Sequence, residues 1–176
     1  INTGKYPGKP QIKWQAVDGA EKYYIYRTTE KDGEFRRAYT PTACSYSNTS
    51  AVPGVTYYYK IAAVTADGTE YISDIVSATA LCAPPKPSYK LVSGTTSSGT
   101  SYTQEPQILW DAVDGAVKYK VYRSSTKDGD YELRVTTKQC SYTNTVAKHG
   151  QVYYYKVAAV DSAGNLNYSA PIKVAV

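Results

Sequence analysis

Apolar and polar residues alternate along most of the chain with a period of two. Ile12, Trp14 and Ala16 alternate with polar neighbours, and the same alternation runs through residues 23–26 and 57–63. A period of two predicts β-strands with one buried face, and no segment shows the sustained 3.6-residue period of an amphipathic helix. Asp-Gly pairs between these runs predict tight turns. The pattern therefore predicts an all-β protein.

The same pattern occurs twice, at a constant offset of 96 residues. Residues 16–20 return at 112–116 and residues 57–60 return at 153–156, and 33 of 71 aligned positions are identical. An internal repeat of this kind decides the architecture before any single residue is considered. Short strands separated by turns at this spacing predict two tandem β-sandwiches of the immunoglobulin-like type.

The repeat divides the chain into a first domain, residues 1–82, and a second domain, residues 83–176, each long enough to close its own core. Proline-rich residues 83–87 predict a stiff, extended linker that leads into the second domain. The first domain has only residues 1–9 for its own first strand, which we expect to be short or truncated. Residues 93–101, rich in Gly, Ser and Thr, predict a long flexible loop.

Composition narrows the class of protein without indicating a reaction. The chain has 20 Tyr and 2 Trp but a single Phe and no Met, and tyrosine suits strands that keep one face wet. The net charge of +5 comes from scattered basic residues, so we expect no nucleic-acid partner. The sequence contains neither a signal peptide nor an apolar run that could span a bilayer. We therefore expect no membrane insertion, and a chain that is a piece or the mature part of a longer protein.

Catalysis has little support in the residues. The single histidine, His149, lies in a turn, and Pro53 takes its place in the first repeat. Asp18 and Asp114 each precede a turn glycine, where Asp is favoured for its local hydrogen bond. Zinc motifs, phosphate-binding loops and nucleophile elbows are absent from the sequence. We expect no catalytic residue, no metal and no cofactor.

Three features resemble a fibronectin type III domain: a Trp in the second strand, Tyr-x-Val/Ile in the third, and Pro-Gly-x-x-Tyr-x-Tyr-x-Ile entering the sixth. The form with Trp-x-Ala-Val-x-Gly-Ala, Val-Tyr-Arg and Tyr-Tyr-Tyr-Lys-Val is similar to the bacterial version found in secreted and cell-surface proteins. The resemblance covers both repeats almost end to end. It implies seven strands in each sandwich, core tryptophans at Trp14 and Trp110, and tyrosine corners at Tyr57 and Tyr153.

The resemblance also implies a role. It points to a non-catalytic accessory, spacer or adhesion module of a bacterial extracellular or cell-surface protein, a monomer whose partners are other domains of the parent protein. Two alternatives stay open. One is a binding module that contacts a cell-surface polysaccharide or a host protein through outward-facing tyrosines or through residues 93–105. The other is a non-catalytic fragment of a secreted carbohydrate-active or other hydrolytic enzyme.

Outward-facing aromatic residues are the candidate ligand surface. If Tyr57 and Tyr59 point into the core, their neighbours point outward on the same sheet. Such a face can stack on sugar rings, although cross-strand tyrosine pairs also stabilise an ordinary wet sheet by about 0.2–1 kcal/mol each. The candidate face consists of Tyr24, Tyr26, Tyr58 and Lys60 in the first domain and of Lys120, Tyr122, Tyr154 and Lys156 in the second.

The three cysteines raise a separate hypothesis. Cys44 and Cys140 occupy equivalent positions, whereas Cys82 has no counterpart in the repeat. The usual role of such residues is that of small, buried, apolar thiols. Topology also allows Cys82, at the end of the first domain, to lie near Cys140. A disulfide between Cys82 and Cys140 would then fix the angle between the domains, provided that the two Cα atoms lie within about 7 Å.

Overall fold

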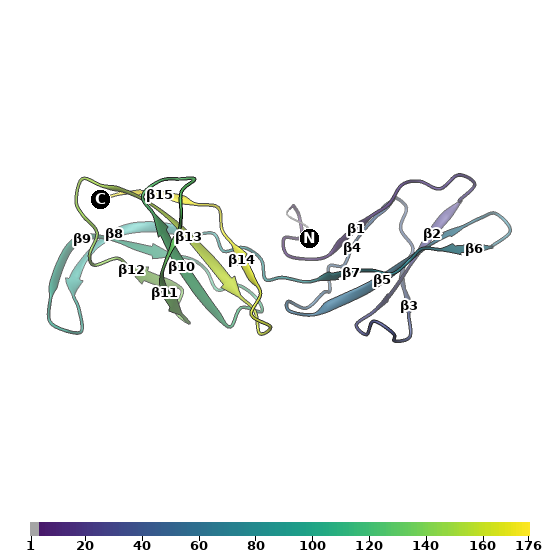
Figure 1. Cartoon of the computed structure of the whole chain (residues 1–176), viewed down its shortest axis with the longest axis horizontal. Coiled ribbons are helices and arrows are strands. Elements are labelled where there is room, and N and C mark those ends of the chain that lie inside the picture. Colours follow the sequence, from purple (N-terminus) through teal and green to yellow (C-terminus); the bar gives the residue numbers. More distant parts are fainter. Residues whose placement is uncertain (1–3) are drawn as a thin grey trace. The chain divides into compact units, whose positions relative to one another are not determined.

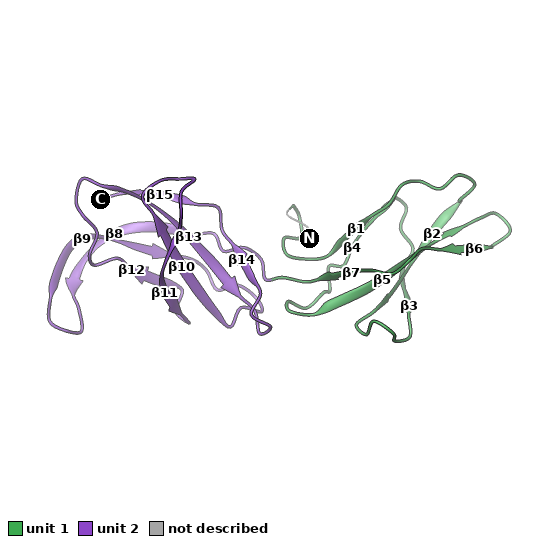
Figure 2. Ribbon diagram, viewed as in Figure 1, with its two compact units in different colours: residues 1–81 green, residues 82–176 purple. Residues whose placement is uncertain are grey.

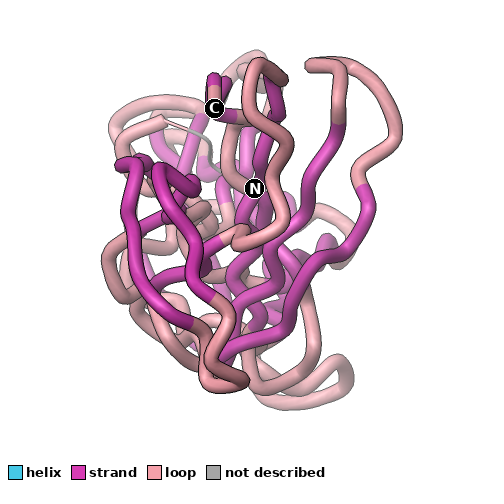
Figure 3. The backbone as a smooth tube through the Cα atoms, turned by 90° about the vertical axis from the view of Figure 1, so that its left-hand side faces the viewer, coloured by secondary structure: helices cyan, strands magenta, loops and turns pink. Residues whose placement is uncertain are grey.

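The computed structural model describes residues 4–176, which form strands and loops without a helix (Figure 1, Figure 3). None of these residues therefore belongs to a helix long and apolar enough to cross a membrane. The chain divides into two compact units, residues 1–81 and residues 82–176 (Figure 2). Each unit contains two sheets, which confirms the predicted all-β class with two immunoglobulin-like sandwiches. The division assigns Cys82 to the second unit, whereas the sequence placed it at the end of the first domain.

Unit 1 packs a two-stranded sheet against a five-stranded one. The smaller sheet pairs β1 with β4, and the larger has the order β3-β2-β5, with β6 and β7 both paired to β5. All pairs are antiparallel. Ile25 and Tyr59 are fully buried between the two sheets. The strands are β1 (Gln11–Lys13), β2 (Lys22–Thr28), β3 (Arg36–Tyr39), β4 (Ser45–Ser47), β5 (Thr56–Val64), β6 (Glu70–Ile72) and β7 (Val76–Thr79).

Unit 2 repeats this plan with one more strand. Its smaller sheet has the order β12-β9-β8, and its larger sheet has the order β11-β10-β13, with β14 and β15 both paired to β13. Val121 and Tyr155, the counterparts of Ile25 and Tyr59, are fully buried in its core. The strands are β8 (Ser88–Thr95), β9 (Ser101–Leu109), β10 (Lys118–Ser124), β11 (Glu132–Thr137), β12 (Ser141–Thr143), β13 (Val152–Val160), β14 (Leu166–Tyr168) and β15 (Ile172–Ala175).

The two units differ at the first strand of the sandwich. When the split last strand is counted once, unit 2 has the seven expected strands, whereas residues 4–81 of unit 1 form six and contain no equivalent of β8. Gly4 to Lys9 form turns at the end of the sandwich where β7 finishes, because the backbone N–H of Leu81 donates to the Gly8 carbonyl at 2.8 Å. The outer edge of β1 is therefore not covered by any described strand.

The loop expected at residues 93–101 is shorter than the sequence indicated. β8 extends to Thr95, β9 begins at Ser101, and the two strands pair directly with a register shift between Val92 and Gly94. Only residues 96–100 form the connecting turn, in which Gly99 has a φ of +87° that glycine adopts without strain. Polar composition predicted a loop, but Ser and Thr also suit a hairpin that is exposed on both faces.

The tryptophans and corner tyrosines lie in or against the two cores. Trp110 is 6% exposed, whereas Trp14 packs against the core of unit 1 but stays partly exposed. The backbone N–H of Val52 donates to the Tyr57 hydroxyl at 3.0 Å. In unit 2 the N–H of Lys148 donates to the Tyr153 hydroxyl, also at 3.0 Å. This hydrogen bond to backbone a few residues upstream is the one that defines a tyrosine corner.

Candidate ligand-binding surfaces

The outer face of the larger sheet in unit 2 carries the first candidate surface. Antiparallel register places Tyr122 opposite Lys156. It also places Lys120 opposite Ala158, which in turn lies opposite Tyr168. Because directly paired residues share a face, all of these side chains belong to the side of the sheet that faces away from the core.

Tyr122 and Tyr168 form an aromatic pair on this face. Their ring centroids lie 5.6 Å apart, with an angle of 52° between the ring planes. Burial, and after it a hydrogen bond with the Tyr168 hydroxyl, raises the pKa of Tyr122 to about 12. The Tyr122 phenol therefore stays neutral at ordinary pH and offers a hydrogen-bonding group beside an aromatic surface.

Lys156 and Tyr131 complete a hollow beside that pair. The Lys156 ammonium group lies 4.0 Å from the centroid of the Tyr131 ring, and the Tyr131 hydroxyl donates to the Lys127 carbonyl at 2.8 Å. The hollow has a volume of about 360 Å³. It is hereafter called the tyrosine hollow and is lined by Tyr122, Tyr131, Lys156, Tyr168 and Ser169. Of the residues predicted for this face, Tyr122 and Lys156 line it, whereas Lys120 and Tyr154 are not among its lining residues.

The equivalent face of unit 1 has a different character, beginning with Tyr24. The Arg37 guanidinium group lies 4.5 Å from the centroid of the Tyr24 ring, and the Lys22 ammonium group lies 5.6 Å from it. Cations held over an aromatic face stabilise the sheet surface by roughly 0.5–1 kcal/mol where they are exposed to water. The ring that a sugar would stack on is thus already in contact with two side chains of the same sheet.

The other candidate residues of unit 1 are also engaged within the unit. The Tyr26 hydroxyl donates to the Glu70 carboxylate at 2.8 Å. The Lys60 ammonium group lies 4.5 Å from the centroid of the Phe35 ring. Tyr58 lies across from Thr28, toward the end of the sheet, and is half-buried. The predicted residues of unit 1 therefore lie on one face, but several of them are already in contact with other side chains of the same unit.

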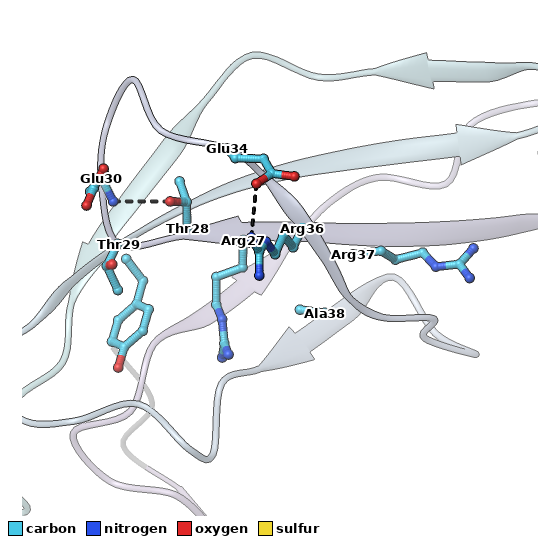
Figure 4. A pocket seen from close by; sticks show the side chains of 9 residues that line it. Arg27, Thr28, Thr29, Glu30, Glu34, Arg36, Arg37 and Ala38 are labelled. Atoms are coloured by element: carbon cyan, nitrogen blue, oxygen red, sulfur yellow. Dashed lines mark hydrogen bonds and ion pairs between the residues drawn. The ribbon is translucent and has the colours of Figure 1, made fainter.

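A second hollow, which lies in unit 1, has three arginines among its lining residues and a volume of about 460 Å³ (Figure 4). Arg27 donates to the Asn48 side-chain oxygen at 2.5 Å, and Arg36 forms an ion pair with Glu34 at 3.1 Å. Arg37 extends away from Arg27 in Figure 4, and its guanidinium group lies over the Tyr24 ring. Since the three guanidinium groups point to different partners, they do not converge on one anion.

A third hollow, hereafter the Trp14 groove, lies beside the core of unit 1. It has a volume of about 250 Å³ and is lined mainly by apolar side chains. No sequence motif predicts this groove, because it lies where the described residues of unit 1 form no equivalent of the segment that leads into β8. Its lining consists of Trp14, Gln15, Val17, Tyr23, Ile61, Ala63, Tyr71, Ile72 and Ser73.

Two of the three cysteines, Cys82 and Cys140, belong to the core of unit 2, whereas Cys44 lies in unit 1. The structure holds Cys44, Cys82 and Cys140 as thiols. The bridge between Cys82 and Cys140 stays a prediction. Cys82 is 2% exposed within the core of unit 2, and Cys140 packs against the same core. Burial raises the pKa of Tyr119, and the nearby Cys140 and Cys82 thiols add to the shift. Because Cys82 and Cys140 both belong to unit 2, a bridge between them would close a loop within that unit and would not set an angle between domains.

Short parts of the chain are similar in sequence to amylopullulanases, while no protein-family profile matches it. The identity with the enzyme of Thermoanaerobacter thermohydrosulfuricus is 44% over 59 residues, and these residues make up 33% of this chain. It is 34% over 67 residues for Thermoanaerobacterium saccharolyticum and 31% over 86 residues for Thermoanaerobacterium thermosulfurigenes, or 38% and 48% of this chain. The match spans only 4–5% of the length of these curated relatives.

Two of the solved structures that match are a receptor chain and a fragment of FN1–FN3 domains. The chicken interferon gamma receptor alpha chain is 11% identical, with a TM-score of 0.51 over 97% of both chains. The FN1–FN3 domains of chicken CNTN1 are 19% identical, with a TM-score of 0.42 over 95% of this chain and 62% of that one. At such identities the likeness concerns the fold alone. The chain is thus similar in fold to the receptor chain and similar in sequence to a small part of long amylopullulanases.

Proposed function

We propose that the chain is a non-catalytic accessory region of a larger bacterial extracellular protein, in which it spaces or presents other domains. The extent of the sequence similarity supports this proposal, since the match takes up to 48% of this chain but 4–5% of its relatives. A region that forms so small a share of a long enzyme fits a spacing or presenting role better than the reaction itself. Fold alone does not give function, so the proposal rests on this extent.

The use of polar side chains within the fold is in keeping with such a role. The fully buried Asp161 accepts hydrogen bonds from the backbone N–H groups of Ala163 and Asn165, so its carboxylate orders a hairpin. A general base needs a positioned partner and access to a substrate. Asp161 is buried and its carboxylate oxygens accept hydrogen bonds from Ala163 and Asn165, so it is not accessible to a substrate. The arginines of unit 1 are likewise engaged with neighbours.

We propose an extracellular or cell-surface location for the parent protein. The matched relatives are named amylopullulanase, and a location outside the cell is where an enzyme would meet polysaccharides supplied by the environment. The partners of this chain would then be the other domains of its parent, with adhesion to a surface as a further role of the same kind.

The accessory role is tested by incubating the purified 176-residue chain with pullulan and with soluble starch and measuring reducing ends. We expect no release above a buffer control. Release that co-purifies with the folded chain through two further columns and disappears on unfolding would contradict the proposal.

Binding of a polysaccharide is a second candidate function, and the tyrosine hollow is the observation that favours it. Aromatic faces with neighbouring hydroxyl and ammonium groups suit sugar rings, because they combine apolar contact with hydrogen bonding. The test is affinity electrophoresis of the chain through gels that contain pullulan or amylopectin. Retardation that is lost in Tyr168→Ala and kept in Tyr89→Ala, an exposed tyrosine on β8 of the same unit, would support binding at the hollow. Equal mobility in gels with and without polymer would contradict it.

A further inference from the structure

The repeat supplies a comparison between the two units at the Trp14 groove. Each residue that lines the groove has a counterpart 96 positions later, so unit 2 shows what the same place looks like when the sandwich is complete. In unit 2 Trp110 is 6% exposed and Val157 is fully buried. Their counterparts in unit 1, Trp14 and Ile61, are partly exposed. The groove is thus an uncovered version of a site that unit 2 covers.

Unit 2 covers the site with the segment that precedes and includes β8. Cys82 is buried in the same core cluster as Trp110, and the Asn167 side-chain amide donates to the Cys82 carbonyl at 2.8 Å. Six residues later, Ser88 begins β8 and pairs with Leu109 on β9. One extended segment therefore fills the hollow with a small side chain and then adds a strand to the sheet edge.

Unit 1 lacks both contributions among its described residues. Tyr71, the counterpart of Asn167, is 64% exposed, and Val17 at the rim of the groove is 49% exposed. β1 pairs with β4 on one side only, so its other edge presents backbone groups to an incoming strand. An apolar groove that continues into an open strand edge is the arrangement by which proteins bind extended peptides.

We propose that the Trp14 groove and the open edge of β1 bind an extended polypeptide segment from outside these 176 residues. The segment has the chemistry of residues 81–88: a small apolar side chain enters the groove, and the residue six positions later pairs with Lys13 as Ser88 pairs with Leu109. It runs antiparallel to β1. This site does not depend on the proposed accessory role, and it differs from the tyrosine hollow in both place and ligand.

A polypeptide fits this site better than a sugar does. The lining is mainly apolar, and the unpaired backbone of β1 offers a ladder of alternating donors and acceptors at strand spacing. The first described residues of the chain do not reach it, because they are held elsewhere. Gly8 bonds to Leu81, and the Lys9 ammonium group donates to the Ala51 carbonyl at 2.6 Å, at the end of β1 away from Trp14.

The test uses the full chain and a synthetic peptide with the sequence of residues 80–92, kept under a thiol reductant. Amide hydrogen exchange followed by mass spectrometry reads out binding. We expect saturable protection of residues 10–14 and of residues near Tyr71. Val17→Asp should weaken binding about tenfold or more, because a carboxylate then faces the incoming apolar side chain. Val52→Asp, at an equally exposed valine elsewhere in unit 1, should leave it unchanged.

A gain-of-function variant makes the test independent of folding defects. Tyr71→Asn introduces the amide that in unit 2 donates to Cys82, so it should tighten binding of the peptide. The proposal is overturned if residues 10–14 gain no protection, or if Val17→Asp and Val52→Asp behave alike. It is equally overturned if maltoheptaose gives the same protection. It is also overturned if the groove is already protected without peptide. Protection that rises with chain concentration would then mean that a second copy covers the groove, and protection that does not would mean that the chain's own first residues cover it.

Discussion

Tyr59 and Tyr155 carry their hydroxyl groups into the two cores, where an asparagine side chain meets each of them. The Asn48 amide donates to the Tyr59 hydroxyl at 2.9 Å, and the Asn144 amide donates to the Tyr155 hydroxyl at 2.8 Å. Burial is the main reason that the pKa of each tyrosine is raised to about 12, while the asparagine hydrogen bond acts in the opposite direction. Folding therefore favours the neutral phenol at both positions.

This pKa shift predicts a loss of stability at high pH. Above pH 10 the unfolded chain releases these phenol protons, whereas the folded chain keeps them until about pH 12. The stabilisation is thus complete below pH 10, and the free energy of unfolding falls by about 1.4 kcal/mol per pH unit for each tyrosine in this window. Urea unfolding between pH 8 and pH 11.5 measures the slope. Tyr155→Phe should reduce the slope for unit 2, where Tyr122 also has a pKa raised to about 12, whereas Tyr71→Phe, at an exposed site, should leave it unchanged. An unchanged slope in Tyr155→Phe would contradict the assignment.

The cysteines give a prediction that decides the bridge hypothesis. All three are thiols in the structure, and Cys82 is 2% exposed. We therefore expect slow reaction with a thiol reagent in the native protein and three reactive thiols per chain after unfolding without reductant. A count of one thiol would instead show that Cys82 and Cys140 form the bridge that the sequence predicts. Cys44→Ser should reduce the count by one in either case, which calibrates the assay.

Strand placement could be read from the sequence because its physical cause is local. Side chains alternate across a strand, so every second residue in the runs around Tyr57 and Tyr153 had to point into the core. The main detail that the sequence did not predict is that the last strand of each unit is split in two. The tyrosine hollow was not readable, because it depends on a register between strands. A register shift between Val121 and Tyr122 interrupts the alternation near β11. Tyr131, which lies just before β11, lines the outer hollow.

Residues 4–81 form no equivalent of β8, and this predicts a difference between the two tryptophans. Trp14 lines an open groove, whereas Trp110 lies beneath the segment that contains Cys82. Acrylamide should therefore quench Trp14 more strongly than Trp110. Trp110→Phe and Trp14→Phe each leave one reporter, and circular dichroism checks that both variants are folded. Equal quenching constants would show that the groove is covered in solution, and addition of the residue 80–92 peptide should lower the quenching of Trp14 alone.

At the scale of the whole molecule, the two sandwiches share a plan but not a core of equal size. The core cluster of unit 2 includes Cys82, Trp110 and Tyr119 among its buried members, whereas the counterparts Trp14 and Tyr23 of the last two are partly exposed in unit 1. Full burial of one large apolar side chain contributes about 1.5–3 kcal/mol, so the difference is large against the stability of a small domain.

We therefore expect unit 1 to unfold first, with a free energy of unfolding lower than that of unit 2 by about 3 kcal/mol or more. Urea unfolding of Trp110→Phe follows Trp14 in an unaltered unit 1, and Trp14→Phe follows Trp110 in an unaltered unit 2, so each reporter sits in the unit that carries no substitution. The Trp14 transition should come at the lower urea concentration. The peptide of residues 80–92 should raise that midpoint and leave the Trp110 midpoint in place, because binding to the folded state alone stabilises it by mass action. Coincident transitions in both variants would mean that the two units unfold as one body and that the open groove costs unit 1 nothing measurable.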